Sequence, residues 1–293
     1  MKLVVGSRGS PLALAQVAII RGLLERAHAG VQIETKIIKT SGDQFTNLSL
    51  AAGGGKGLFT KEIEEQLRRG EIDVAVHSMK DLPTELPDGL TVGAVPARED
   101  ARDVLIAKQS GSLAALPAGA RVATSSIRRR AQLLAQRPDL QVEEIRGNIE
   151  TRLRKLAESA TLDALILAAA GLRRLGLWRG DFRLLEIEEM IPAVGQGAIA
   201  CEVREQDFAT QELLAPVNDA DTMTCTAAER AFLQAMGGGC QVPYAAHAQV
   251  EGTELRLVAA VFSPDGEDVR KVADRARKSE PEELGRRAAS QIL

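Results

Sequence analysis

A single cysteine, Cys240, lies in a segment whose neighbours leave its thiol open to a large group. Gly237, Gly238 and Gly239 precede it, and Pro243 follows three positions later. Because glycine has no Cβ atom, the backbone here can turn freely and approach a bulky ligand closely. Such a thiol suits chemistry or covalent attachment, whereas most free cysteines are buried and inert. The segment alone leaves both interpretations open.

A second group of reactive side chains follows the apolar segment 74–76. His77, Ser78, Lys80 and Asp81 occur within five residues. A carboxylate beside a lysine stays ionised, so Asp81 could stabilise a developing cation or exchange a proton with a leaving amine. Polar residues also commonly end a strand, which leaves a structural role open. No spacing of His and Cys in the chain resembles a metal site, and we expect no bound metal.

Positive charge is concentrated in residues 121–180, which contain 12 Lys and Arg but only 6 Asp and Glu, although the whole chain has a net charge of −3. All but one of these cations are arginines, whose planar guanidinium suits carboxylate or phosphate. Several follow hydroxyl groups or glycine at expected helix starts, where an anion would offset repulsion from the helix dipole. The pattern predicts an anion site, with a solvated basic helix face as the alternative. With 6 Phe, 1 Tyr and 1 Trp, the chain lacks the stacking surfaces of single-strand nucleic-acid binders, and we expect no nucleic-acid partner.

Two further glycine-containing turns carry cations. The first places Arg8 and Ser10 at an expected helix N-terminus, whose free N–H groups attract anions. A plain helix cap with a surface cation is the alternative. The second, residues 53–61, contains Lys56 and Phe59. Because no Ser or Thr follows Lys56, the segment does not match a nucleoside-triphosphate loop. We expect either a lid over a cleft or an ordinary surface loop.

These groups follow short apolar strands that alternate with amphipathic helices. The expected elements are strand 3–6, helix 10–27, strand 31–38, helix 59–69, strands 73–77, 91–95, 102–107 and 121–124, helix 126–136, strand 141–145, helix 148–158 and strand 163–168. Repeated alternation predicts an α/β fold with parallel or mixed sheets and helices on both faces. After residue 222, a helix over 226–236 and strands over 245–250 and 254–262 predict a small α+β domain.

The length of 293 residues accommodates two or three domains. Segments near 97–101 and 190–200 are expected to form a hinge pair between two α/β lobes, and ligands commonly bind between such lobes. Three cysteines without paired spacing favour a reducing compartment. Arg8 interrupts the N-terminal apolar run, and no apolar run reaches transmembrane length. We therefore expect a cytoplasmic protein with no membrane partner.

Together these segments resemble the porphobilinogen deaminase family, also called hydroxymethylbilane synthases, from Leu3 to the C-terminus. The matching motifs are Ser7–Gln16, Gly55–Glu62, Val76–Asp81, Thr124–Arg129, Arg146–Arg152, Pro192–Gly197 and Gly238–Pro243. Any one of these motifs would be weak support, but seven in the same order are specific.

The resemblance implies two periplasmic-binding-protein-like α/β lobes with mixed sheets and a small C-terminal α+β domain. The expected boundaries are 1–97 with 198–216 for domain 1, 101–192 for the arginine-rich domain 2, and 220–293 for domain 3. Such a transferase joins four porphobilinogen molecules head to tail into 1-hydroxymethylbilane and releases ammonia each time, in tetrapyrrole and haem biosynthesis. We expect a monomer.

The resemblance also implies roles for individual residues. It implies a dipyrromethane cofactor attached to Cys240 through a thioether, and catalytic roles for Asp81, Lys80 and Arg8. The expected cofactor contacts are Asp81, Ser78, Lys80, Thr124, Ser126, Arg128, Arg129, Arg146 and Gly147. The expected substrate contacts are Arg8, Ser10, Lys56, Phe59, Arg152 and Arg174. Some relatives carry a further lysine where this chain has Ala52.

The alternative function is a two-lobed anion-binding protein without catalysis. It would explain the arginines and the hinged lobes, but it gives no role to Cys240 or Asp81. Porphobilinogen carries acetate and propionate groups, so a growing chain of pyrroles gains carboxylates at every step. An arginine-rich domain suits such a ligand, and we favour the transferase.

Overall fold

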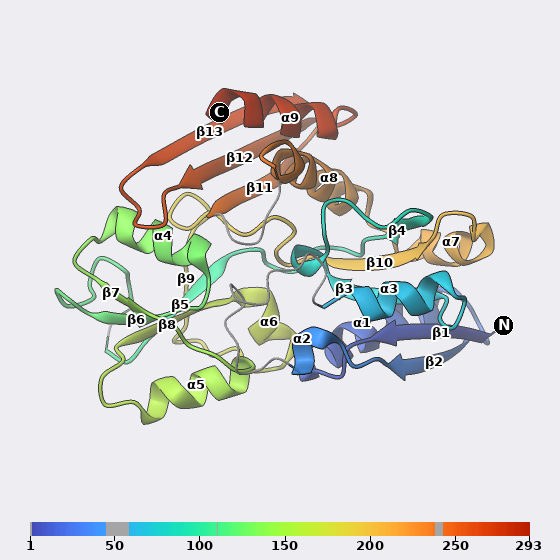
Figure 1. The fold of residues 1–293 in the computed structure, drawn as a ribbon, viewed down its shortest axis with the longest axis horizontal. Coiled ribbons are helices and arrows are strands. Elements are labelled where there is room, and N and C mark those ends of the chain that lie inside the picture. The colour runs from blue at the N-terminus through green and yellow to red at the C-terminus, as the bar shows by residue number, and fades with distance from the viewer. Residues whose placement is uncertain (1, 45–58, 110, 238–242) are drawn as a thin grey trace. The chain divides into compact units, whose positions relative to one another are not determined.

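The computed structural model describes residues 2–44, 59–109, 111–237 and 243–293 (Figure 1). The chain divides into two units, the first Met1–Glu99 with Ala198–Thr226 and the second Asp100–Gly197 with Ala227–Leu293. The second unit thus joins the arginine-rich segment to the C-terminal segment. The division into three domains stays a prediction.

The first unit is built on a five-stranded mixed sheet. Its strand order is β2 (Gln32–Ile37), β1 (Lys2–Ser7), β3 (Val74–Ser78), β10 (Ile199–Arg204) and β4 (Leu90–Ala94). β1 pairs in parallel with β2 and β3, whereas β10 runs antiparallel to β3 and β4. The helices of this unit are α1 (Pro11–Ala27), α2 (Ser41–Gln44), α3 (Lys61–Arg68), α7 (Phe208–Leu214) and the 3-10 turns η1 (Met79–Asp81) and η2 (Ala215–Val217).

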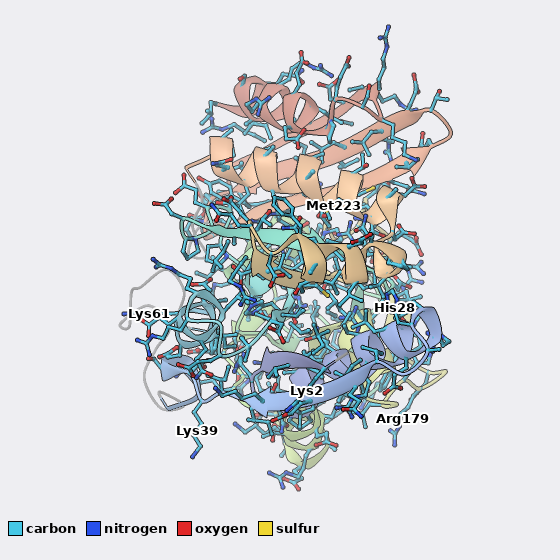
Figure 2. All side chains as sticks on the ribbon, turned by 90° about the vertical axis from the view of Figure 1, so that its right-hand side faces the viewer. Lys2, His28, Lys39, Lys61, Arg179 and Met223 are labelled. Atoms are coloured by element: carbon cyan, nitrogen blue, oxygen red, sulfur yellow. The ribbon has the colours of Figure 1, made fainter. Side chains whose placement is uncertain are left out.

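Both faces of this sheet are covered by helices. Leu3 and Val5 pack with Ile20 of α1 in one core cluster, whereas Val4, between them, packs with Ile63 and other residues in a second. Successive side chains of a strand point to opposite faces, so α1 and α3 cover opposite sides of the sheet. Lys39 and Lys61 project outward from this unit (Figure 2).

The second unit contains a sheet with the same arrangement. Its order is β7 (Gln141–Glu143), β6 (Arg121–Ala123), β8 (Ala164–Ala168), β5 (Asp103–Ala107) and β9 (Arg183–Leu184), with helices α4 (Ile127–Gln136), α5 (Ile149–Glu158) and α6 (Ala169–Arg174). β6 pairs in parallel with β7 and β8, and β5 is antiparallel to β8 and β9. The prediction of two α/β lobes with mixed sheets is confirmed.

The C-terminal part is a three-stranded antiparallel sheet of β11 (Tyr244–Glu251), β12 (Glu254–Phe262) and β13 (Val269–Arg277), followed by α9 (Pro281–Ile292). A Cβ atom at Gly285 of α9 would lie 2.3 Å from the carbonyl oxygen of Ala228 in α8 (Ala220–Ala235). Glycine therefore allows these two helices to touch. The α+β structure expected for the C-terminal segment is confirmed, whereas its status as a separate domain stays a prediction.

The expected elements differ from the observed ones mainly at their ends. α3 begins at Lys61, two residues after Phe59. α8 begins at Ala220, six residues earlier than expected, because the Asp219 side chain accepts a hydrogen bond from Thr222 N at 2.7 Å and caps the helix. Among the helices of the described residues, none has the length and apolar character needed to cross a bilayer.

Candidate active site

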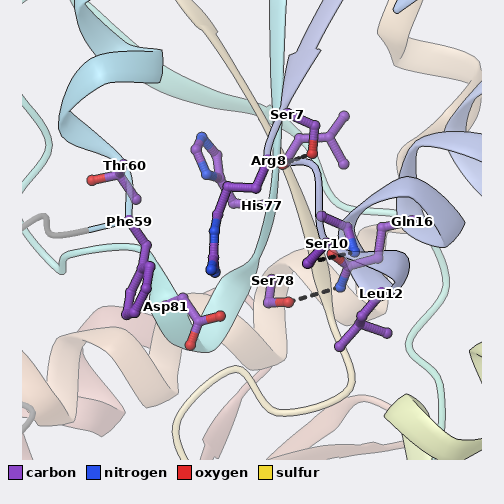
Figure 3. Close-up of a pocket in the computed structure, with 12 residues that line it drawn as sticks. Ser7, Arg8, Ser10, Leu12, Gln16, Phe59, Thr60, His77, Ser78 and Asp81 are labelled. Carbon is purple, nitrogen blue, oxygen red and sulfur yellow. Dashed lines mark hydrogen bonds between the residues drawn. The ribbon is translucent and has the colours of Figure 1, made fainter. Parts of the chain in front are cut away.

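In the first unit, β1 and β3 end side by side and bring two of the expected motifs together. Arg8 and Ser10 follow β1, whereas Ser78 is the last residue of β3 and Asp81 ends η1, the turn that follows it. Side chains from both segments line a small pocket of about 60 Å³, which Phe59 also lines (Figure 3). Polar side chains at the ends of parallel strands are where α/β sheets bind ligands.

Hydrogen bonds and an aromatic contact fix the pocket residues. Ser10 caps α1, its hydroxyl accepting from Ala13 N at 3.2 Å. Gln16, buried one turn further along α1, donates from Nε2 to the Ser78 hydroxyl at 2.8 Å. The Arg8 guanidinium lies 4.2 Å from the centre of the Phe59 ring (Figure 3), a cation–π contact that orients the arginine.

Two other predicted residues of this segment of the chain are not among the described residues that line the pocket. Lys80 is exposed in η1 and is not among the residues that line the pocket. Lys56 lies outside the described residues. Their expected roles stay predictions.

A buried acidic cluster lies on the α3 side of the same strand end. His77 Nε2 lies 3.1 Å from Glu202 Oε2, and both side chains are buried. Glu64 of α3 is also buried, and burial together with the charge of Glu202 raises its pKa. Glu64 and Glu202 were not predicted as site residues, because nothing in their local sequence separates them from surface glutamates.

In the second unit, the parallel strands β6, β7 and β8 end at one edge of their sheet, and the arginine-rich turns follow them. Ser126 caps α4 by accepting from Arg129 N at 3.4 Å, and Asn148 caps α5 by accepting from Thr151 N at 2.8 Å. Gly147 has φ +116°, a conformation that an L side chain rarely adopts. The sequence therefore predicted these two turns correctly, including the glycine.

Arg128 and Arg129, in the first turn of α4, point into the protein, and each is 6% exposed. Their shared partner is Asp103 of β5, whose Oδ2 accepts from Arg128 Nη2 at 2.7 Å and whose Oδ1 accepts from Arg129 Nη2 at 2.8 Å. Burial opposes ionisation of Asp103, but attraction by the two arginines outweighs it and lowers the pKa of Asp103 to about 2. A buried carboxylate of this kind is ionised at neutral pH.

The remaining arginines of this edge are more accessible. Arg146 pairs with Glu144 at 2.8 Å. Arg152 is half-buried and donates from Nε to Gly147 O at 2.7 Å. Burial and the charge of Arg129 lower the pKa of Arg152.

Arg174 of α6, which follows β8, donates to Gly197 O at 2.6 Å. The turn Thr124–Ser126 and the three accessible arginines all follow strands that end at this edge. Hydroxyl groups and guanidinium groups are hydrogen-bond donors suited to anions.

This edge fits a ligand that carries several carboxylates. Two guanidinium groups, of Arg128 and Arg129, face one carboxylate, so their cluster keeps a net positive charge. Arg128 Nε is buried without a hydrogen-bond partner among the described residues. The repulsion felt by Arg152 also indicates positive charge that a bound anion would offset. A dipyrromethane with acetate and propionate groups matches this donor set, although Cys240 itself lies outside the described residues.

Sequence reasoning missed Asp103, on which the arginine pair depends. One local signal existed, because an aspartate begins the apolar run Val104–Ala107, and buried charges are nearly always paired. The sequence did not indicate the partner, since Asp103 and Arg128 are 25 positions apart.

The strand order defines the class of the protein. Each α/β lobe has three parallel strands followed in space by an antiparallel strand and an edge strand, which defines a protein with two α/β lobes built on mixed sheets. Solved structures similar to the chain include the methionine binding protein MetQ, at 12% identity and a TM-score of 0.43 over 78% of this chain and 94% of that one. The effector binding domain of BenM matches at 14% identity and a TM-score of 0.42 over 74% of this chain and 90% of that one.

The chain belongs to the porphobilinogen deaminase family. The family model described as "Porphobilinogen deaminase, dipyromethane cofactor binding domain" matches residues 3–212, and the one described as "Porphobilinogen deaminase, C-terminal domain" matches 223–293. A porphobilinogen deaminase of Geobacillus sp. (strain WCH70) is 50% identical, covering 100% of this chain and 94% of the relative. One of Roseiflexus sp. (strain RS-1) is 49% identical, covering 99% and 95%. The chain is therefore a transferase of tetrapyrrole biosynthesis that uses a dipyrromethane cofactor, and the alternative of a binding protein without catalysis is not favoured.

Proposed function

We propose that the chain joins four porphobilinogen molecules head to tail into 1-hydroxymethylbilane, with Asp81 as the catalytic group and Cys240 as the attachment point of the cofactor. The observation that carries this proposal is the pairing of chemistries at the strand ends. One lobe presents a carboxylate in a small pocket, and the other presents arginines and hydroxyl groups for carboxylates. The bound dipyrromethane supplies the free pyrrole position to which the first porphobilinogen is joined.

The arginine-rich edge binds the carboxylate groups of the cofactor and of the growing chain. Hydroxyls of Thr124 and Ser126, the guanidinium groups of Arg128, Arg129 and Arg146, and the open backbone of Gly147 are proposed to hold the cofactor with Ser78 and Lys80. Arg8, Ser10, Arg152 and Arg174 are proposed to bind substrate carboxylates, and Lys56 and Phe59 to cover them. Guanidinium groups suit this task because they bind carboxylates with two hydrogen bonds in a fixed plane.

Asp81 is proposed to hold and move protons during each addition. Its carboxylate accepts a hydrogen bond from a pyrrole N–H and so stabilises the positive charge that develops when ammonia leaves the aminomethyl carbon. The joining of two pyrroles releases a proton from the attacking ring carbon, and the departing amine needs one. A carboxylate that lies within reach of both the ring carbon and the amine can carry that proton from one to the other.

The properties of the other cysteines support Cys240 as the attachment point. Cys201 and Cys225 are both buried, and burial raises the pKa of the Cys201 thiol to about 12. A thioether forms from an accessible, ionisable thiol. Cys240, next to three glycines, is the cysteine whose sequence setting provides that access.

Intact-mass measurement tests the proposal directly. The purified protein should exceed its 31.3 kDa chain mass by one dipyrromethane. Cys240→Ser should lack this increment and be inactive, whereas the control Cys225→Ser should keep it. Asp81→Asn should keep the increment but lose nearly all turnover. An active protein of unmodified mass would exclude the cofactor attachment, and normal rates in Asp81→Asn would exclude its catalytic role.

We further propose that the enzyme works as a monomer in the cytoplasm. The absence of paired cysteine spacing supports a reducing compartment. Size-exclusion chromatography with light scattering should give a mass near 31.3 kDa, and a mass twice as large would contradict the monomer.

A further inference from the structure

One buried carboxylate organises the arginine pair of the second unit. Asp103 is fully buried, and its two oxygens bind Arg128 and Arg129. Arg129 also donates from Nε to Asp103 Oδ1 at 3.2 Å, so it binds the same oxygen twice. Both guanidinium groups are therefore held from one side by a single group.

Backbone carbonyls hold the same guanidinium groups at a further point. Arg129 Nη1 donates to Ile166 O at 3.0 Å, and Arg128 Nη1 donates to Ile191 O. With a carboxylate and a carbonyl on each, neither arginine can rotate without breaking a buried hydrogen bond, which is costly. The orientation of the pair is set before any ligand binds.

Gln196 connects Asp103 to the two segments that join the units. Its Nε2 donates to Asp103 Oδ1 at 2.8 Å and to Ala101 O at 2.7 Å, and the side chain is 1% exposed. Ala101 lies just inside the point where the chain enters the second unit, and Gln196 lies just before the point where it leaves. One amide therefore joins both connecting segments to the carboxylate that holds the arginines.

We propose that Asp103 is a positioning residue for the transferase reaction and that Gln196 holds it in place. Asp103 does not contact the ligand. It orients Arg128 and Arg129 and leaves the pair with net positive charge for a ligand carboxylate. The inference rests on the proposed function, in which this pair binds the carboxylates of the cofactor.

Three variants of the full-length holoenzyme test this role. Asp103→Asn removes the charge at constant size. Gln196→Leu removes the amide but leaves the carboxylate and both arginines intact. Gln136→Leu is the control, because Gln136 donates to Gln132 O at 3.1 Å and to Glu189 O at 2.7 Å, beside the same connecting segment, but donates neither to Asp103 nor to the carbonyl groups of Ile166 and Ile191. The measurements are the fraction of protein that carries the cofactor by intact mass, the melting temperature, and KM and kcat for porphobilinogen.

The two test variants should differ from the control in specific ways. Asp103→Asn should reduce the fraction carrying the cofactor on the order of tenfold, because it leaves two buried arginines without their counter-charge. Gln196→Leu should keep the cofactor but raise KM about fivefold, roughly the effect of one lost hydrogen bond, with kcat within about twofold. Gln136→Leu should leave the KM for porphobilinogen unchanged.

The outcomes separate this inference from the proposed function. If Gln196→Leu keeps the wild-type KM, as Gln136→Leu should, the positioning role is excluded. The positioning role is excluded as well if Asp103→Asn folds, carries the cofactor and has the wild-type KM. Where Asp103→Asn does not fold, the comparison of the two glutamine variants decides. Failure of the proposed function would instead appear in the wild type, as a protein with no added mass and no turnover.

Discussion

Protonating Asp103 removes the carboxylate that offsets Arg128 and Arg129, so this one residue should make stability depend on pH. The two arginines outweigh the effect of burial and lower its pKa from the ordinary 3.8 to about 2. Each pKa unit corresponds to about 1.4 kcal/mol, so ionisation of Asp103 contributes about 2 kcal/mol to the free energy of unfolding. Because the pKa is lower in the folded state, this contribution is present above about pH 5 and is lost as the pH falls through about 2.

The difference between wild type and Asp103→Asn isolates this contribution from those of the other carboxylates. The free energy of unfolding can be followed in urea by the fluorescence of Trp178, the single tryptophan, which lies in the same unit. The stability gap between the two proteins should be largest near pH 6. It should shrink by about 1 kcal/mol by pH 3 and by a similar amount below that.

The control is Asp268→Asn, because Asp268 pairs with Arg270 at 3.4 Å on the surface, where solvent screens the pair. Its stability gap to wild type should change much less over the same pH range. A gap between wild type and Asp103→Asn that stays constant from pH 6 to pH 3 would refute the reasoning, because the ionisation of Asp103 would then not be linked to folding.

Three further substitutions test other parts of the site. Phe59→Leu removes the aromatic contact of Arg8, worth about 0.5–1 kcal/mol at a partly exposed position, and should raise KM about two- to fivefold; an unchanged KM would show that Arg8 does not need the ring. Burial raises the pKa of Glu64 above 4.5, so its charged form is disfavoured in the folded state. The stability of the wild type in urea should therefore fall relative to that of Glu64→Gln as the pH rises above 4.5. A stability difference that does not change with pH would contradict a buried acid. Gly147→Ala would place a Cβ atom 2.7 Å from the Thr151 side chain at a backbone φ of +116°, and it should cost about 1–3 kcal/mol of stability. The control Gly180→Ala has no atom within 4 Å of its Cβ and should cost little. Equal losses of stability in the two variants would refute the strain at Gly147.

Local sequence was enough to predict the turns that carry the site. Ser10 and Ser126 occupy helix starts and accept the capping hydrogen bonds expected of them. Gly147 has the positive φ that only glycine adopts easily. These features depend on residues within about four positions of each other, so a linear pattern contains the information. The seven ordered motifs identified the family for the same reason.

The direction of the arginines could not be predicted from the same pattern. Arg128 and Arg129 read as cations at an exposed helix start, yet both are buried. Their orientation depends on Asp103, which lies on an antiparallel strand of the sheet beneath α4. The acidic cluster of His77, Glu202 and Glu64 likewise joins residues from β3, β10 and α3.

The sequence by itself determined the family, the strand-to-helix turns and the side-chain chemistry that they present. Only the tertiary structure decided which of those charges point to the ligand edge and which are paired inside the protein. The physical reason is the cost of burying an unpaired charge, which links Arg128 and Arg129 to a carboxylate that only the fold brings within reach. Only the folded structure therefore identifies Asp103 and Gln196 as candidates for positioning the site.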